Sequence, residues 1–279
     1  MEFHKLDLHT HSCLSDGTFR PAEIVRLASE AGISLLALTD HDGLQGVAEA
    51  REAAAQTPGL TFLPSVEMDT EFPEELHILG LDLNPDDAAL TDALSLAAER
   101  RQARNEKILD KLAGVGCDVR PFLDARAGIV TRMHIAHALC DGGFARDTKD
   151  AFARYLRPGR PGYASVPRFA PEEVIRLILR AGGVPVLAHP CHLRCNVHRL
   201  VAELAEYGLM GVEVYYPAAT PGQIEQHAAI ARQHGLLMTC GSDFHGANRP
   251  ASPLGCAYRP VQALEDCCQF FINRHKTPS

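Results

Sequence analysis

The sequence lacks several features that would assign it to a specialised class of protein. It contains no Trp, and aromatic residues make up only 6% of its 279 residues. Charged residues, Gly or Pro interrupt every apolar run before it reaches the roughly 18 to 20 residues that a membrane-spanning helix needs. The first eight residues lead into a charged, strand-like segment and not into the apolar core of a secretion signal. We therefore predict a cytoplasmic protein with no membrane contact.

Basic charge is also scarce, and the cysteines form no pattern. Lys and Arg number 27 against 35 Asp and Glu, which gives a formal net charge of −8 and excludes a broad basic surface for duplex DNA. The nine cysteines are odd in number and scattered, so a disulfide framework is not expected. With 46% apolar residues, the chain has the composition of a globular protein with a sizeable core. A small anionic ligand would be bound locally, by metal ions or a few arginines.

Short apolar strands alternate with amphipathic helices along most of the chain. The pattern predicts strands at residues 3–9, 34–39, 60–66, 75–81, 184–188, 211–214 and 236–240, with helices between them and a closing helix at 261–274. This alternation predicts an α/β fold with a parallel sheet, and about seven strands favour a closed barrel over an open sheet. Residues 86–167 contain helical patterns at 86–113 and 131–141 but no strand. We predict that they form a helical cap inserted into a barrel of residues 1–85 and 168–279.

Histidine is the abundant residue, with 14 copies, and many of them stand with carboxylates at the ends of predicted strands. The carboxyl ends of parallel strands meet at one edge of a barrel, where active sites lie. Five strands deliver such groups there, so the side chains are expected to converge. Their number exceeds what one ion can use, and mixed imidazole and carboxylate ligation without Cys favours Mn, Fe or Zn over Mg or Ca. The residues are His9, His11, Asp16, His41, Glu67, His77, His189, Asp243 and His245.

Each motif taken alone has a simpler explanation. His9 and His11 could be two surface histidines of a loop, and Asp16 beside a glycine could be a turn residue. His77 lies in an apolar run and could be a core histidine with its hydrogen bonds satisfied. Glu67 is different, because a carboxylate that ends an apolar strand must be paired, exposed or coordinated. Chance readily explains a His, Asp or Glu at one strand end, but it does not readily explain such residues at five.

Together these motifs resemble the PHP family, the polymerase and histidinol phosphatase metal-dependent phosphoesterases. The matching segments are Asp7-Leu-His-Thr-His11, Ser15-Asp-Gly17, Leu38-Thr-Asp-His-Asp42, Glu67, His77, Ala188-His-Pro190 and Ser242-Asp-Phe-His245. The resemblance implies a distorted (βα)7 barrel with two or three divalent metal ions, taken as manganese with iron or zinc as alternatives. By position, His9, His11, Glu67 and Asp243 would bind the first metal; Glu67, His77 and His134 the second; and Asp16, His41 and His245 the third.

The resemblance also assigns catalytic and substrate-binding roles. His189 and Asp243 would be catalytic, with His189 contacting the phosphate or assisting the leaving group. Residues 131–139 and 155–163 resemble segments of the nucleoside 3′,5′-bisphosphate phosphatases and of exonucleases that trim RNA 5′ ends. This branch implies that Arg132 and Arg160 bind phosphate oxygens, although Arg160 could also be a solvated turn charge.

The sequence departs from this branch after residues 188–190. Relatives tend to have Gly-Arg there, whereas this chain has Cys191 and His192, with Arg194 two positions later. A phosphate contact is therefore lost or moved. We take His192 and Arg194 as candidate substrate-binding residues.

Four hypotheses of function follow. The main one is hydrolysis of a phosphomonoester of a small nucleotide, such as a nucleoside 3′,5′-bisphosphate, by a metal-activated water. The alternative is 5′ to 3′ exoribonuclease action on the 5′ end of a short RNA. Histidinol phosphatase activity is less favoured because the cap resembles the nucleotide branch. A non-catalytic metal-binding accessory domain is less favoured because the ligand set is complete. The sequence does not indicate the oligomeric state.

Overall fold

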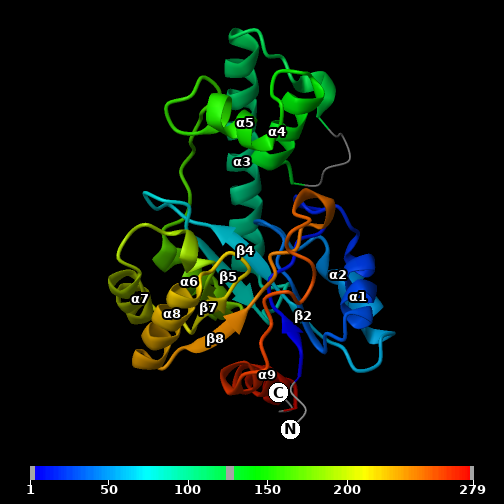
Figure 1. Cartoon of the computed structure of the whole chain (residues 1–279), viewed down its shortest axis with the longest axis vertical. Helices are drawn as coiled ribbons and strands as arrows, with labels where there is room; N and C mark the ends of the chain where they lie inside the picture. The colour runs from blue at the N-terminus through cyan, green and yellow to red at the C-terminus, as the bar shows by residue number, and fades with distance from the viewer. Residues whose placement is uncertain (1–3, 124–128, 277–279) are drawn as a thin grey trace.

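The computed structural model describes residues 4–123 and 129–276, and its strands form two sheets (Figure 1). The first sheet is parallel and contains β1 (Leu6–Asp7), β2 (Leu35–Leu38) and β3 (Thr61–Pro64) in that order. The second has the order β4 (Val66–Asp69), β5 (His77–Leu81), β6 (Val184–Leu187), β7 (Gly211–Tyr215) and β8 (Leu237–Cys240). The predicted α/β fold is confirmed. Within the described residues, however, the strands do not form one closed parallel ring.

The direction of β5 is the main departure from the predicted parallel sheet. It pairs antiparallel with both β4 and β6, while β6, β7 and β8 are parallel to one another. A parallel pair needs a crossover of a dozen or more residues, and the connection 70–76 between β4 and β5 is too short for one. The predicted strand 60–66 also divides at Ser65 into β3 and β4, so Glu67 lies inside a strand and not after its end. Strand β1 is shorter than the predicted 3–9, of which residue 3 lies outside the described part.

Backbone hydrogen bonds join the two sheets at both junctions. After β1, the Leu8 amide donates to the Cys240 carbonyl (3.0 Å), and the Asp243 amide donates to the His9 carbonyl (2.9 Å). After β2, the Asp42 amide donates to the Glu67 carbonyl (2.8 Å). The carboxyl end of β1 is therefore fixed beside that of β8, and the carboxyl end of β2 is fixed beside β4.

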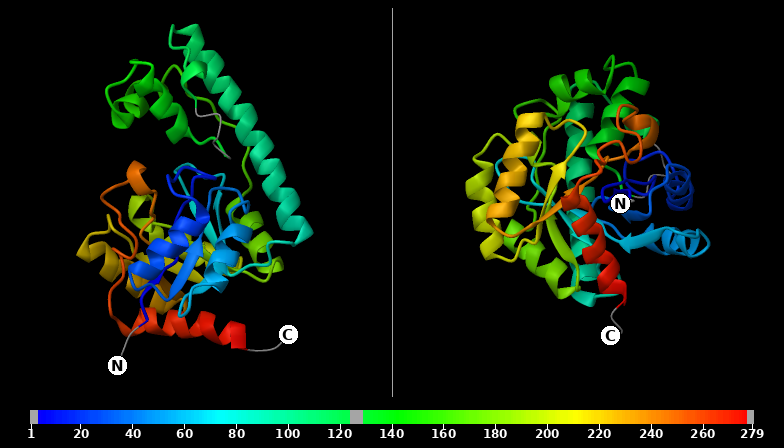
Figure 2. Two further views of the ribbon diagram at one scale, coloured as in Figure 1. Left: turned by 90° about the vertical axis from the view of Figure 1, so that its right-hand side faces the viewer. Right: turned by 60° about the horizontal axis from the view of Figure 1, so that its bottom comes forward.

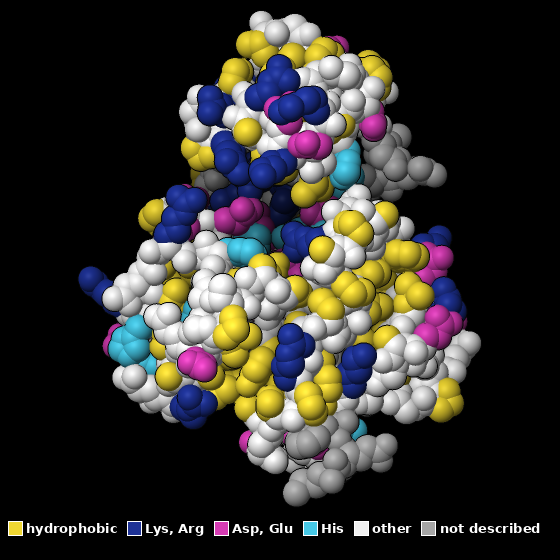
Figure 3. All heavy atoms as spheres, viewed as in Figure 1, with side chains coloured by type: hydrophobic (Ala, Val, Ile, Leu, Met, Phe, Trp, Pro, Cys, Tyr) yellow, Lys and Arg dark blue, Asp and Glu magenta, His cyan; other side chains and the backbone are white. Residues whose placement is uncertain are grey.

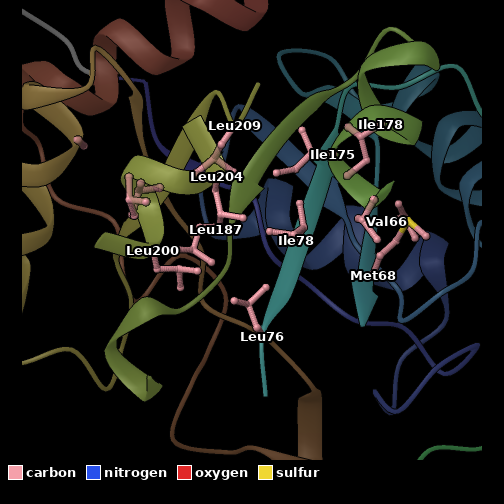
Figure 4. Packing of buried hydrophobic residues seen from close by; sticks show 14 of the residues in the cluster. Val66, Met68, Leu76, Ile78, Ile175, Ile178, Leu187, Leu200, Leu204 and Leu209 are labelled. Atoms are coloured by element: carbon pink, nitrogen blue, oxygen red, sulfur yellow. The ribbon is translucent and has the colours of Figure 1, made fainter. Parts of the chain in front are cut away.

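Helices cover the outer faces of both sheets. They are α1 (Pro21–Glu30) and α2 (Val47–Ala55) beside the first sheet, and α6 (Pro171–Arg180), α7 (Val197–Glu206) and α8 (Pro221–Gln233) beside the second. Figure 4 shows Ile175 and Ile178 of α6 packed close to Val66, Met68 and Ile78 of the sheet. Helix α9 (Gln262–Lys276) lies at the end of the molecule where both termini are found (Figure 2). Short helical turns η3 (Pro190–His192) and η4 (Gly246–Asn248) follow β6 and β8.

The 27-residue helix α3 (Ala88–Gly114) extends away from the sheets and carries the remaining helices at its far end (Figures 1 and 2). These are η1 (Arg120–Phe122), α4 (Arg132–Asp141), α5 (Thr148–Ala151) and the π-helical turn η2 (Phe152–Leu156). They share a separate cluster of buried residues that includes Leu109, Leu112, Ile135 and Leu139. The predicted helices at 86–113 and 131–141 are confirmed. In the described ranges, no helix is both long and apolar enough to cross a membrane.

Candidate metal centre and substrate cavity

A buried group of imidazoles and carboxylates, called here the metal cluster, lies at the junctions between the two sheets. It comprises His9, His11, Asp16, His41, Glu67, His77, His189, Asp243 and His245. Most of these residues come directly after β1, β2, β6 or β8, while Glu67 lies in β4 and His77 begins β5. The structure thus brings together the predicted strand-end residues.

The Glu67 carboxylate is at the centre of the metal cluster and only 1% of its surface is exposed. Each of its two oxygens faces several imidazole nitrogens. Oε1 is 2.8 Å from His77 Nδ1 and 3.0 Å from His189 Nε2, and Oε2 is 3.1 Å from His41 Nδ1, 3.3 Å from His11 Nε2 and 3.4 Å from His9 Nε2. One carboxylate therefore links five histidines from four segments of the chain.

Two aspartates complete the metal cluster. Asp243 Oδ1 is 3.3 Å from His11 Nε2 and 3.5 Å from His9 Nε2. Asp16 Oδ1 is 3.2 Å from His245 Nε2. Asp243 also has a φ of 52°, a left-handed conformation that is unusual for a residue other than Gly and that is found most often at functional sites.

The arrangement of the donor atoms suits coordination of divalent cations better than hydrogen bonding among the side chains themselves. His9 Nε2 and His11 Nε2 are 3.1 Å apart, so two ring nitrogens face each other. His9 Nδ1 lies 3.0 Å from Glu213 Oε1; a neutral ring that donates from Nδ1 directs its Nε2 lone pair into the metal cluster, as in histidines that bind metals. Although carboxylate oxygens lie nearby, the buried atoms His11 Nδ1, His41 Nδ1 and Asp16 Oδ1 have no hydrogen-bond partner.

Three groups of residues have ligand atoms that all lie within 4.8 Å of one another. The groups are His9, His11 and Glu67; His41, Glu67 and His77; and His11, Asp16, His41 and His245. Each group contains both imidazole and carboxylate donors, the chemistry expected of a site for Zn, Mn or Fe. The structure therefore offers a site for divalent metals.

Electrostatics keep several members of the metal cluster ionised, whereas burial lowers the pKa of His41 to about 4. Burial alone would lower the pKa of His11, but Asp243 and Glu67 outweigh it and raise the pKa to about 9. Burial is likewise outweighed at His77, where Glu67 and Asp69 raise the pKa to about 10. The same imidazoles hold the pKa of Glu67 well below its usual value despite its burial. Cations would therefore displace protons from this site.

A cavity of about 580 Å³ opens above the metal cluster. Arginines from α3 and α4 line its other side, and we call Arg101, Arg104 and Arg132 the arginine face. Figure 3 shows the hollow, with Lys and Arg side chains above it and Asp, Glu and His side chains below it. The volume is typical of a small-molecule site, and the two sides carry the charges that a cation-assisted anion site requires.

Three of the four predicted substrate-binding residues line this cavity. Arg132 is among them, and its Nη2 donates to Glu75 Oε1 (2.6 Å). His192 lies 3.2 Å from the Tyr216 hydroxyl, measured from Nε2, and Arg194 lines the same cavity. The structure does not bring Arg160 there, because this exposed residue lies in the turn after η2.

His134 also lies apart from the three ligand groups. It occupies the first turn of α4, where its Nδ1 accepts a hydrogen bond from the Thr131 amide (3.0 Å). The structure therefore assigns His134 a helix-capping contact, while its role as a metal ligand stays a prediction.

Sequence reasoning missed several residues of the site. Glu213 in β7 accepts from His9 and, at 2.7 Å, from the His189 amide, and it is only 1% exposed. The rule that singled out Glu67, a carboxylate in an apolar strand, would have found it. Asp69 lies two residues after Glu67, on the same face of β4, and so also faces the metal cluster. No sequence signal distinguishes Arg249, which forms an ion pair with Asp243.

The fold is α/β, and it places buried metal-binding side chains on one side of a cavity and arginines on the other. These features define a protein that binds divalent metals and an anionic ligand. A model of the PHP domain matches residues 7–118. The 3′,5′-nucleoside bisphosphate phosphatase of Chromobacterium violaceum is 35% identical to this chain, with 90% of each sequence covered. The 5′-3′ exoribonuclease Rnm of Salmonella typhimurium is 36% identical, with 86% of this chain and 84% of that one covered.

The three-dimensional fold is also similar to that of a solved structure. A solved structure of an amidohydrolase from Chromobacterium violaceum with bound sulfate matches with a TM-score of 0.87 and 32% identity, covering 97% of this chain and 96% of that one. The chain belongs to the PHP family, which confirms the resemblance found in its motifs.

Proposed function

We propose that this protein is a metal-dependent phosphoesterase that hydrolyses a phosphomonoester of a small nucleotide, with a nucleoside 3′,5′-bisphosphate as the main candidate. The observation that carries the proposal is the buried metal cluster facing the arginine face across one cavity. The relative named a 3′,5′-nucleoside bisphosphate phosphatase supports the choice of substrate. The charge pattern suits a phosphorylated nucleotide and not duplex DNA.

We assign two or three divalent cations to the metal cluster, with manganese as the first choice and iron or zinc as alternatives. The first would be bound by His9, His11, Glu67 and Asp243, and the third by Asp16, His41 and His245. The second would be bound by Glu67 and His77, with His134 as the predicted further ligand. When bound, such ions act as Lewis acids that lower the pKa of water and neutralise phosphoryl oxygens.

Other side chains of the protein position the substrate and orient the metal-binding residues. Glu213 orients the His9 ring and also fixes the His189 backbone. His189 lines the cavity, where its ring can contact a phosphate or donate a proton to the leaving oxygen. Arg132 presents a planar guanidinium to phosphate oxygens from the opposite side of the cavity.

The alternative function is removal of nucleotides from the 5′ end of short RNA. It is supported by the relative named a 5′-3′ exoribonuclease, and by exposed His192 and Arg194 at the cavity, which could contact a longer chain. Incubation with adenosine 3′,5′-bisphosphate and with 5′-phosphorylated RNA oligomers distinguishes the two. The main proposal expects inorganic phosphate from the first substrate, whereas mononucleotides from the second alone would favour the alternative.

We further propose a distorted (βα)7 barrel, made by the two sheets together, with residues 86–167 as its cap. The hydrogen bonds at both sheet junctions and the separate core of the cap helices support this division. A cytoplasmic location remains part of the proposal. The proposed function is tested by measuring phosphate release by the metal-loaded protein. We expect this activity to be lost when a chelator removes the metals and to be regained when the metals are added back.

A further inference from the structure

Arg104 in α3 is a buried cation with no ion-pair partner among the residues that the structure describes. Only 3% of its surface is exposed, yet its guanidinium donates only to the side chain of the next residue, Asn105 Oδ1, from Nη2 (3.1 Å) and Nε (3.4 Å). Within residues 4–123 and 129–276, no carboxylate oxygen forms an ion pair with it. Three residues earlier, Arg101 forms an ion pair with Asp42 and lies 3.2 Å from Asp69 Oδ2.

The surroundings of Arg104 make this charge costly. An unpaired ion in a protein interior loses hydration without gaining a partner in return. Burial and the neighbouring Arg101 lower the pKa of Arg104 to about 9, and the charges of Arg132 and Arg168 act in the same direction, while the charge of Asp69 opposes them. The side chain nevertheless remains protonated near pH 7, so the folded protein keeps a positive charge that no ion pair within the described residues neutralises.

The position of Arg104 indicates what would neutralise it. It belongs to the arginine face and lines the same cavity as Glu67, His77 and Asp243. Asn105 donates from Nδ2 to the Val130 carbonyl (2.8 Å), so its Oδ1, the oxygen that binds the guanidinium, is fixed in place. A fixed guanidinium fork facing a cavity is a pre-organised site for an oxyanion.

We propose that Arg104 binds the second phosphate of the substrate, the group that is not hydrolysed, while the metal cluster receives the phosphate that is. This inference rests on the proposed phosphoesterase function. It makes Arg104 the residue that distinguishes a bisphosphorylated nucleotide from a monophosphate. Arg101 has a different role, because its charge is already paired.

The first test compares two substrates. Arg104→Gln should lower kcat/KM for adenosine 3′,5′-bisphosphate by about 10- to 100-fold, the value of a charge-assisted hydrogen bond. It should leave kcat/KM for adenosine 5′-monophosphate within about threefold. Arg104→Lys, which keeps the charge without the fork, should lie between the wild type and Gln. Arg146→Gln removes a cap arginine that is exposed and away from the cavity, and should change neither substrate.

The second test is independent of turnover. Adenosine 3′,5′-bisphosphate is titrated calorimetrically into the full chain in EDTA, where hydrolysis is blocked, and circular dichroism verifies that each variant is folded. Arg104→Gln should weaken binding by about tenfold or more relative to the wild type and to Arg146→Gln. If wild-type protein releases no phosphate from any nucleotide, the proposed function fails, and this titration still decides the anion site. Unchanged affinity, or an equal loss of kcat/KM for both substrates, would overturn the proposal.

Discussion

The two sides of the cavity differ in how their charges are paired. In the metal cluster, each carboxylate faces several imidazoles, and Glu67 alone faces five. On the arginine face the pairing decreases from Arg101, which contacts two aspartates, to Arg132 with one glutamate and Arg104 with none among the described residues. The protein therefore provides both charges of the metal cluster itself, whereas Arg104 of the arginine face depends on a ligand for its negative charge.

The largest expected effect comes from the centre of the metal cluster. Glu67→Gln removes the one negative charge that five imidazoles share, so metal binding should fail and phosphate release should decrease by about a thousandfold or more. Metal content is measured together with initial rates. Glu52→Gln, an exposed glutamate of α2, is the matched control. Full activity of the Glu67 variant with a normal metal content would remove Glu67 from the ligand set.

The paired arginine should matter for stability. Arg101→Gln leaves the buried Asp42 without its cation and removes one of the two arginines that pair with Asp69, the other being Arg168; breaking such a buried pair costs about 3 kcal/mol or more of unfolding free energy. Urea unfolding of the metal-free chain measures this loss. A loss below about 1 kcal/mol would show that the ion pairs are no stronger than those at a surface.

Glu213 should have an intermediate effect, because it acts through His9 and His189. Glu213→Gln should weaken manganese binding by about 10- to 100-fold while saturating metal restores most of the activity. Metal titrations at equilibrium measure the change. An unchanged metal affinity with a low kcat at saturating metal would instead assign Glu213 a role in the reaction itself.

The pH dependence of metal binding tests the charge state of the metal cluster. With pKa values of about 9 and 10, His11 and His77 are protonated at neutral pH, and a cation binds only the neutral ring. Manganese binding should therefore release protons and strengthen as the pH rises toward 9, by about tenfold per pH unit for each proton displaced. Calorimetry in two buffers of different ionisation enthalpy counts the protons. A pH-independent affinity would contradict the raised pKa values.

The smallest expected effect is a change in unfolding free energy that distinguishes Arg104 from Arg101. Because Arg104 is buried without an acidic partner, Arg104→Gln should raise the stability of the ligand-free chain by about 1 kcal/mol, opposite in sign to the Arg101 variant. The same urea experiment measures it. A loss as large as that of Arg101→Gln would mean that Arg104 stabilises the fold rather than a ligand.

The two sides also differ in how well the sequence predicts them. The metal cluster was predictable because His9, His41, His189 and Asp243 each follow a short apolar strand, and strand ends meet in space whatever the details of the sheet. The reversed β5 could not be predicted from periodicity, which is the same for both strand directions. This error did not affect the site, since His77 still enters it from the first residue of that strand.

Of the arginine face, Arg132 was predicted, but Arg101 and Arg104 were missed because α3 is rich in charge and each of its arginines looks like part of a solvated helix surface. Arg100 and Arg101 are adjacent in sequence, yet Arg100 lies over the Phe169 ring while Arg101 is buried against aspartates. Only the packing of α3 over the sheets makes this distinction. Arg160 is the opposite case. Residues 155–163 resemble a phosphate-binding segment of related enzymes, but Arg160 is exposed in the structure.

Anomalous X-ray scattering at the manganese edge, from crystals of the full chain grown with Mn²⁺, tests the central claim most directly. The account predicts two or three peaks within coordination distance of the three ligand groups, with Glu67 next to more than one of them. Peaks only at surface carboxylates, or no peak near Glu67, would contradict it.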